Sequence, residues 1–262
     1  MPSLSAARID QCRERADAAL IGYLTVGYPD VQGTIRAGTT LIENGFDILE
    51  LGLPYSDPGM DGPVIQATGA HALAAGTRTR HVFEVVEALA PLGAPILVMT
   101  YYNPIFRYGD EAFARDLANA GGAGTITPDL IPDEGGAWIE ATTKHDLDRV
   151  FLVAPSSTDE RLETTANACR GFVYAASTMG VTGERAAVDT TARTLVRRTR
   201  EAGAARVCVG LGVSSGAQAR EIGAFADGVI VGSALLRALG DGQDRLAELA
   251  QDLAEGVQGA RA

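Results

Sequence analysis

The chain has 262 residues, of which 46% are hydrophobic and 21% are charged, so it can bury a large core and is not intrinsically disordered. The formal net charge of −11 argues against nucleic acid or an anionic membrane as a partner. No apolar run approaches the ~20 residues that cross a bilayer, and the N-terminal segment lacks the apolar stretch of a secretory signal. We therefore expect a cytoplasmic protein.

Few residues are available for metal or cofactor chemistry. The three cysteines are far apart and form no CxxC pair, which argues against a disulfide framework or a zinc site. The only lysine is Lys144, and the only histidines are His71, His81 and His145. A lysine Schiff base or a histidine metal cluster has very few residues to use, so we expect no metal and no cofactor in this chain.

Short runs rich in Val, Ile, Leu and Gly alternate with longer helical segments along the whole chain, as in successive βα units. Strands are predicted at about 20–25, 46–51, 95–100, 123–127, 149–153, 171–176, 206–210 and 226–231. Helices are predicted at about 31–44, 63–76, 78–90, 110–120, 134–143, 158–168, 190–202, 214–222 and, in pieces, 233–257.

This alternation predicts an α/β fold, a single (β/α)₈ TIM barrel with extra short helices that takes up residues 1–262 as one domain. An open, doubly wound sheet is the alternative, because one miscounted strand would change the count. In a barrel of this kind the catalytic residues lie at the C-terminal ends of the strands and in the loops that follow them.

The predicted strand 46–51 carries an unusual residue near its end. Side chains alternate between two faces along a strand, so Leu49 and Leu51 share the face suited to packing under helices. Ile48 and Glu50 share the other face, which would point into the barrel. Partial desolvation there would raise the pKa of the glutamate towards a value useful to a general acid. The ordinary alternative is a salt bridge from Glu50 to an arginine across the barrel mouth.

The loop at residues 54–63 contains two aspartates among three prolines and two glycines, which indicates a shaped loop. Asp57 precedes a proline and is typical of a turn. Asp61 precedes a predicted helix, so its ordinary role would be an N-cap. We expect Asp61 to face the barrel mouth together with Glu50.

Glycine-rich segments follow the last three predicted strands, at residues 177–183, 210–215 and 231–234. Glycine lets backbone N–H groups approach a ligand, and a helix N-terminus supplies aligned donors. The loops after strands 7 and 8 are the usual phosphate site of this barrel. The pattern predicts a phosphate held mainly by backbone N–H groups and Ser233.

The block from Glu50 to Gln66 resembles the tryptophan synthase α subunit family, and the resemblance extends almost from end to end of the chain. Other matching motifs lie at residues 23–30, 101–104, 128–132, 180–183, 210–214 and 232–234. Gly59 and Met60 depart slightly from the family pattern, as does Thr127. The resemblance implies that Thr127 bears on the lining of the pocket that holds the indole ring of the substrate.

The resemblance implies a lyase of L-tryptophan biosynthesis that reversibly cleaves indole-3-glycerol phosphate to indole and glyceraldehyde 3-phosphate. It implies Glu50 and Asp61 as catalytic carboxylates. The substrate-binding residues that it implies are Tyr23, Tyr101, Tyr174, Gly183, Gly212, Gly232 and Ser233.

The resemblance also implies a partner, the β subunit of tryptophan synthase, which carries pyridoxal phosphate and receives indole through a tunnel in an αββα heterotetramer. The implied interface residues are Pro54, Tyr55, Asp57, Tyr102, Asn103, Pro104, Phe106 and Pro132. We expect the loops at 54–63 and 177–189 to be mobile in the isolated chain and to become ordered on binding of partner and substrate.

Three alternatives differ in what they require. Another phosphate-binding barrel enzyme would turn over a different phosphate and would not need Glu50. A non-catalytic activator of a β-type partner would tolerate the loss of Glu50. A stand-alone indole-releasing lyase of the same fold would work at full rate without a partner.

Overall fold

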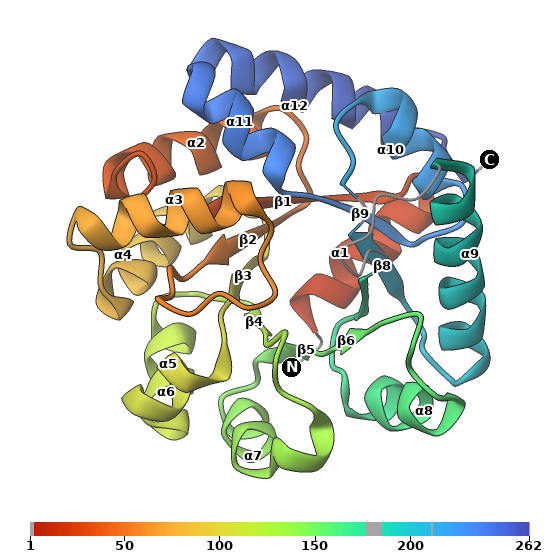
Figure 1. The fold of residues 1–262 in the computed structure, drawn as a ribbon, viewed down its shortest axis with the longest axis horizontal. Helices are drawn as coiled ribbons and strands as arrows, with labels where there is room; N and C mark the ends of the chain where they lie inside the picture. The colour runs from red at the N-terminus through yellow and green to blue at the C-terminus, as the bar shows by residue number, and fades with distance from the viewer. Residues whose placement is uncertain (1–2, 177–184, 211, 262) are drawn as a thin grey trace.

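The computed structural model describes residues 3–176, 185–210 and 212–261. Within them nine parallel strands form one sheet in the order β5-β4-β3-β2-β1-β9-β8-β7-β6 (Figure 1). The strands are β1 (Ala19–Thr25), β2 (Ile48–Gly52), β3 (Ile96–Met99), β4 (Gly124–Ile126), β5 (Asp148–Val150), β6 (Leu152–Val153), β7 (Val173–Ala176), β8 (Val207–Gly210) and β9 (Gly228–Val231).

The sheet closes into a barrel of eight positions. β5 pairs with β4, β6 pairs with β7, and only Phe151 separates β5 from β6, so these two short strands together fill the fifth position. The predicted TIM barrel is confirmed, and the open doubly wound sheet is wrong. The nine strands pair with one another only in parallel, so in the described part of the chain their C-terminal ends meet at one mouth.

Helices surround the strands in the described part of the chain (Figure 1). They are α1 (Leu4–Glu14), α2 (Val31–Glu43), α3 (Pro63–Ala74), α4 (Thr79–Leu89), α5 (Tyr102–Tyr108), α6 (Asp110–Asn119), α7 (Gly136–Lys144), α8 (Asp159–Ala168), α9 (Arg185–Glu201), α10 (Gly216–Gly223), α11 (Ser233–Asp241) and α12 (Gln243–Val257), with short 3₁₀ turns at Ala90–Leu92 and Pro132–Glu134. None of the described helices combines the length and the apolar character needed to cross a membrane.

Two of these helices were absent from the sequence prediction. α1 buries Ser5, Ala6, Ile9 and Cys12, a face too small and too mixed to stand out as an apolar stripe. α5 has only 7 residues, and its N-cap residue Tyr101 makes no side-chain cap. Both helices depend on tertiary contacts that a local pattern does not contain.

Two apolar layers hold the barrel together. The larger lies between the strands and the outer helices and includes Leu49 and Leu51. The smaller fills the barrel interior and includes Ile48 of β2 together with Ile9 and Cys12 of α1. α1 therefore closes the N-terminal end of the barrel, and the alternation predicted for β2 is confirmed.

Buried carboxylates fasten the N-terminal end of the barrel. Asp148 accepts hydrogen bonds from the N–H and the hydroxyl of Ser5, at 3.0 and 2.6 Å. Asp227 is fully buried and accepts the Val207 N–H at 2.8 Å. Three arginines surround it, with nitrogen–oxygen distances of 3.7 Å for Arg13, 3.0 Å for Arg200 and 3.0 Å for Arg261.

We expect Asp227→Ala to lower the free energy of unfolding by about 2–4 kcal/mol, because the arginines lose their shared counter-charge and the Val207 N–H loses its acceptor. Urea unfolding followed by circular dichroism measures this change. The matched control is Asp159→Ala, which removes an Asp–Arg pair whose aspartate side chain is 87% exposed and should cost about 1 kcal/mol or less. Equal losses in the two variants would contradict the assignment.

Candidate active site

Glu50 lies inside the barrel at the C-terminal end of β2 and is 1% exposed. Its strand neighbours in register are Tyr23 on β1 and Leu97 on β3. Among the described residues its Oε1 atom has no hydrogen-bond partner, and no arginine pairs with it. Burial raises the pKa of Glu50 from 4.5 to about 8, so the carboxyl group is protonated at neutral pH.

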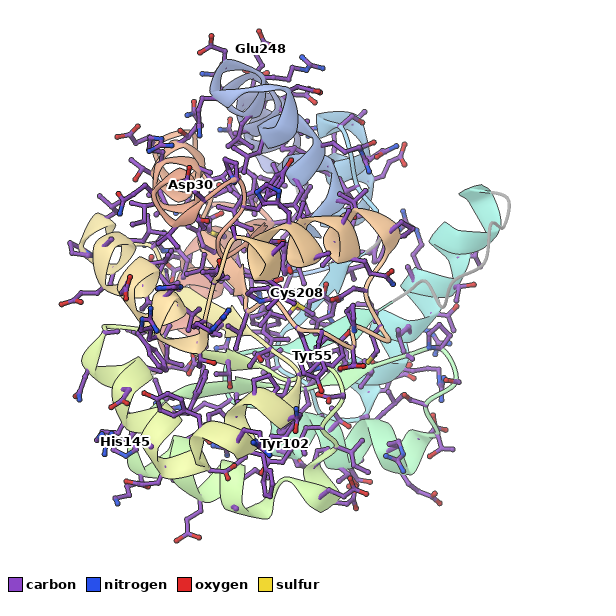
Figure 2. The ribbon with its side chains drawn as sticks, turned by 60° about the vertical axis from the view of Figure 1, so that its left-hand side comes forward. Asp30, Tyr55, Tyr102, His145, Cys208 and Glu248 are labelled. Atoms are coloured by element: carbon purple, nitrogen blue, oxygen red, sulfur yellow. The ribbon has the colours of Figure 1, made fainter. Side chains whose placement is uncertain are left out.

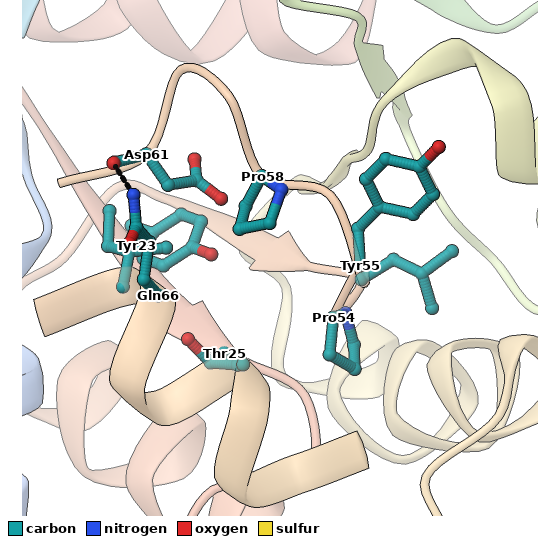
Figure 3. A pocket seen from close by; sticks show the side chains of 10 residues that line it. Tyr23, Thr25, Pro54, Tyr55, Pro58, Asp61 and Gln66 are labelled. Carbon is teal, nitrogen blue, oxygen red and sulfur yellow. Dashed lines mark hydrogen bonds between the residues drawn. The ribbon is translucent and has the colours of Figure 1, made fainter. Parts of the chain in front are cut away.

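Asp61 stands at the end of the loop that follows β2, and it does not cap α3. The N-cap residue is Gly62, which makes no side-chain cap, so the N-cap alternative is wrong. The main-chain carbonyl of Asp61 accepts the Gln66 side-chain amide at 2.8 Å (Figure 3). Burial raises the pKa of the Asp61 carboxyl to about 6, and a hydrogen bond with Tyr101 opposes this rise. Asp61 is therefore mostly ionised at neutral pH.

Two tyrosines extend over the barrel mouth because glycines leave room for them. A Cβ atom on Gly52 would overlap the Tyr23 hydroxyl, and one on Gly210 would lie 2.5 Å from the Tyr174 hydroxyl. Burial raises the pKa of both phenols well above its usual range, with the Asp61 and Glu50 carboxylates adding to the effect. Both tyrosines therefore remain hydrogen-bond donors at neutral pH.

Two adjoining depressions meet at the mouth and share Tyr23, Leu53 and Asp61. Figure 3 shows the first, in which the Asp61 carboxylate and the Tyr23 hydroxyl lie on the same side. The second is lined also by Met99, Thr100, Tyr101 and Pro128. Apolar and aromatic walls around one carboxylate suit a flat aromatic ring that presents an N–H group. Thr127, the first residue after β4, is buried and precedes Pro128 in the chain.

The predicted phosphate-binding residues Gly212, Gly232 and Ser233 follow β8 and β9, and β9 pairs with β1. Gly212 has a φ of +61°, a left-handed conformation that favours glycine. Gly232 is the N-cap residue of α11 and Ser233 is the first residue of that helix. A Cβ atom on Gly232 would lie 3.5 Å from the Tyr23 Cβ, so the N-terminus of α11 adjoins the depressions. Gly183 lies outside the described residues, as do residues 177–184 of the second predicted loop.

A profile of the tryptophan synthase alpha chain family matches residues 9–261. The chain belongs to the tryptophan synthase alpha chain family. The tryptophan synthase alpha chain of Mycobacterium ulcerans is 59% identical over 249 residues, which cover 95% of this chain and 93% of the relative. That of Mycobacterium tuberculosis is 58% identical over 249 residues, covering 95% and 92%.

Solved structures of the family have the same barrel. The aminoacrylate-bound form of tryptophan synthase from M. tuberculosis matches with a TM-score of 0.91 at 53% identity, over 97% of this chain and 99% of that one. Tryptophan synthase subunit alpha from Legionella pneumophila matches with a TM-score of 0.90 at 26% identity, over 98% and 99%. The fold persists while about three quarters of the residues differ.

In this member of the family, the residues predicted to meet a partner lie on the loop after β2, on α5 after β3 and, for Pro132, on the segment after β4. The Tyr55 ring stacks on the Tyr101 ring at 5.1 Å, and Asn103 donates to the Tyr55 hydroxyl at 3.1 Å. Phe106 is 65% exposed. Asp57 and Asn103 are exposed, Tyr102, Pro104 and Pro132 are half-buried, and Pro54 is buried within the chain.

Sequence reasoning missed one residue of this region, Asp129, which follows β4. Its carboxylate accepts the N–H of Tyr102, the first residue of α5, at 2.9 Å. The signal in the sequence was its place within the motif at residues 128–132, but nothing local pairs Asp129 with a helix that begins 27 residues earlier.

The lysine and the histidines lie away from the two carboxylates. Lys144 ends α7 and pairs with Glu111 at 2.7 Å, and the next residue, His145, contacts the same carboxylate at 2.8 Å. His145 lies near the edge of the molecule (Figure 2). His71 bonds to the Pro29 carbonyl oxygen at 2.8 Å. In the part of the chain that the structure describes, no three His, Cys, Asp or Glu side chains cluster as metal ligands do.

The raised pKa of Glu50 makes stability depend on pH. Between 4.5 and about 8 the folded chain keeps a proton that the unfolded chain releases, so stability falls as pH rises through this window. The loss is on the order of 3 kcal/mol by pH 7. We expect Glu50→Gln to flatten this fall, as measured by urea unfolding at pH 5 and pH 8. Glu163→Gln, at an exposed position of α8, is the control. If stability falls between pH 5 and pH 8 as much in Glu50→Gln as in the unmodified chain, Glu50 does not hold a proton in the folded state.

Proposed function

We propose that the chain reversibly cleaves indole-3-glycerol phosphate to indole and glyceraldehyde 3-phosphate, as the α subunit of tryptophan synthase in L-tryptophan biosynthesis. One observation carries the proposal. In a barrel of the tryptophan synthase alpha chain family, a protonated and unpaired Glu50 lies next to Tyr23 in strand register, and Tyr23 and the ionised Asp61 line the same aromatic-walled depression.

Glu50 is the general acid of the proposed reaction. It gives its proton to carbon 3 of the indole ring, which becomes an indolenine cation. The bond between this carbon and the glycerol chain then breaks, and its electron pair returns to the ring as the carbon 2–carbon 3 double bond. The glycerol hydroxyl loses its proton to the ionised Glu50 as its carbon becomes the aldehyde. Catalysis of this kind is worth ~10²–10⁴-fold in rate.

Asp61 stabilises the cation that this step creates. Its carboxylate accepts the ring N–H and places a negative charge beside the nitrogen on which positive charge develops. The apolar walls around Tyr101 and Met99 keep water from this pair, which strengthens their interaction. Tyr23 and Tyr101 hold the ring, and Tyr174 lies beside the glycerol phosphate.

The phosphate would bind next to the depressions, where β8 and β9 end. Backbone N–H groups at Gly183, Gly212 and Gly232, the Ser233 hydroxyl and the N-terminus of α11 would hold it. The distance that the substrate spans between Asp61 and this end fixes the reacting carbon above Glu50. Anchoring both ends in this way converts binding energy into orientation.

The substrate supplies the electron sink. Aldolases often use a lysine iminium or a metal ion for this purpose. The only lysine in the chain, Lys144, ends the helix that leads into the start of β5, at the far end of the barrel from the mouth. The protonated indole ring accepts the electrons instead, so we propose that this chain needs no cofactor of its own.

The proposed partner is a pyridoxal-phosphate β subunit in an αββα assembly. It would dock on Tyr55, Asp57, Tyr102, Asn103, Pro104, Phe106 and Pro132, with Pro54 beneath them.

We further propose that residues 1–262 form one domain, since all described strands share one sheet. A cytoplasmic location is supported by the three cysteines, all of which are free.

Glu50→Gln keeps the shape of the side chain and removes the acid, so we expect cleavage of indole-3-glycerol phosphate to fall by ~10²-fold or more with binding largely kept. Asp61→Asn should lose a similar factor. Indole release is the measurement, and Lys144→Ala, which changes an exposed ion pair, is the control with unchanged turnover.

The same assay over a range of pH tests the two roles. The rate should fall below pH ~6 as Asp61 is protonated and above pH ~8 as Glu50 is ionised. Cleavage by Glu50→Gln within a few-fold of the unmodified chain would remove Glu50 from the mechanism. No cleavage by the unmodified chain would favour another phosphate-binding barrel enzyme.

Partner binding should raise the rate of the isolated chain at least tenfold. The reason is that Asp61 sits on a loop whose exposed residues form the proposed docking face, and misplacement of ~1 Å can cost ~10²-fold. Steady-state cleavage with and without a saturating β subunit measures the effect. A lone chain already at full rate would point to a stand-alone indole-releasing lyase instead.

A further inference from the structure

The start of α5 receives its hydrogen-bond acceptor from a distant loop. Its N-cap residue is Tyr101, whose side chain makes no cap. The Asp129 carboxylate, from the loop after β4, accepts the N–H of Tyr102 at 2.9 Å instead. A carboxylate at the first turn of a helix is favourable, because the N–H groups there have no partner within the helix. This arrangement leaves the Tyr101 side chain available for the site.

Tyr101 uses its side chain to hold the loop that carries Asp61. Its hydroxyl accepts the N–H of Met60, the residue before Asp61, at 2.9 Å. The Tyr101 phenol also acts on the Asp61 carboxyl, whose pKa it lowers. One phenol therefore holds the backbone next to Asp61 and interacts with its carboxylate.

A second tyrosine packs on Tyr101 from the same loop. The Tyr55 ring lies 5.1 Å from the Tyr101 ring with an interplanar angle of 30°, which is a stacked arrangement. Asn103 on α5 donates to the Tyr55 hydroxyl at 3.1 Å. The loops after β2, β3 and β4 are thus joined through side chains, with Tyr101 at the junction.

We propose that Asp129 is a positioning residue of the active site, which fixes the start of α5 and thereby holds Tyr101 in contact with Met60 and Asp61. Asp129 does not line either depression and is exposed, so it touches no substrate itself. The inference rests on the proposed function only for its effect on rate.

This relay, from Asp129 through Tyr101 to Asp61, predicts the direction in which the pH dependence of the rate shifts when it is broken. The hydrogen bond from Tyr101 lowers the pKa of Asp61, so loss of that bond raises it and moves the acidic limb of the rate to higher pH. Loss of the Asp129 charge alone would act in the opposite direction, because a like charge nearby raises the pKa of a carboxyl. Among the described residues, the other titratable groups coupled to Asp61 are Tyr23 and Tyr174, which remain neutral at these pH values.

The test compares variants of the full chain in complex with a β subunit. Asp129→Ala should lower kcat about tenfold or more and shift the acidic limb upward. Asp129→Asn keeps an oxygen that accepts the Tyr102 N–H. It should restore kcat to within a few-fold and return the acidic limb to its original pH. Tyr101→Phe should reproduce the upward shift, and adding Asp129→Ala to it should shift the limb no further.

The control removes a different helix cap. The Asp30 carboxylate accepts the Gly33 N–H at 2.6 Å and caps α2, outside the depressions. Asp30→Ala should lower stability while the acidic limb stays in place. If Asp129→Ala behaves like Asp30→Ala, or moves the limb downward, Asp129 is only a structural cap and the proposal is wrong.

Hydrogen exchange gives a readout that does not require turnover. The Met60 amide should exchange faster in Asp129→Ala and in Tyr101→Phe, and at the original rate in Asp129→Asn and Asp30→Ala. An unchanged Met60 amide in Asp129→Ala would overturn the relay even if the chain cleaves indole-3-glycerol phosphate. Absence of cleavage by the unmodified chain would overturn the function and leave the exchange result standing.

Discussion

The burial of one uncharged carboxyl group, that of Glu50, is the feature on which the proposed chemistry of this barrel depends. Glu50 stands inside a barrel whose lower interior is filled by aliphatic side chains and whose N-terminal end is closed by Ile9 and Cys12 of α1. Buried apolar side chains lie between it and the N-terminal end, and among the described residues no arginine or lysine pairs with it. This environment raises its pKa to about 8 and keeps a proton available at neutral pH. The floor of the barrel is therefore part of the chemistry at its mouth.

The two ends of the barrel treat buried carboxylates in opposite ways. At the N-terminal end, three arginines surround Asp227, and Ser5 and Arg170 contact Asp148, so each of these carboxylates has a positive charge beside it. At the C-terminal end, Glu50 lacks such partners in the described part of the chain. Removing a partner from a paired carboxylate destabilises the fold, whereas the unpaired carboxyl group of Glu50 costs stability and has a pKa suited to acid catalysis. This division matches the general separation of stability and catalysis between the ends of TIM barrels.

The periodicity of the sequence was sufficient to predict the strands and the inward position of Glu50. Alternation along β2 places Leu49 and Leu51 in the outer layer and Ile48 inside the barrel. Three features could not be predicted from local pattern. The buried face of α1 is short and mixes polar with apolar residues, α5 is capped across a gap of 27 residues by Asp129, and the fifth strand is interrupted at Phe151. Each depends on contacts between segments far apart in the chain. The two catalytic carboxylates of the proposal, in contrast, were visible because their residue types are unusual where they stand.

The two carboxylates are held with unequal rigidity. Glu50 belongs to a strand paired on both sides, so its position follows from the backbone of the barrel. Asp61 belongs to a loop, and its position follows from side-chain contacts of Tyr55 and Tyr101 with neighbouring loops. Loops have lower local stability than paired strands, so any loss of geometry falls first on Asp61. A partner that binds the exposed edge of these loops would therefore act on the carboxylate that stabilises the cation, while the acid in the barrel keeps its place.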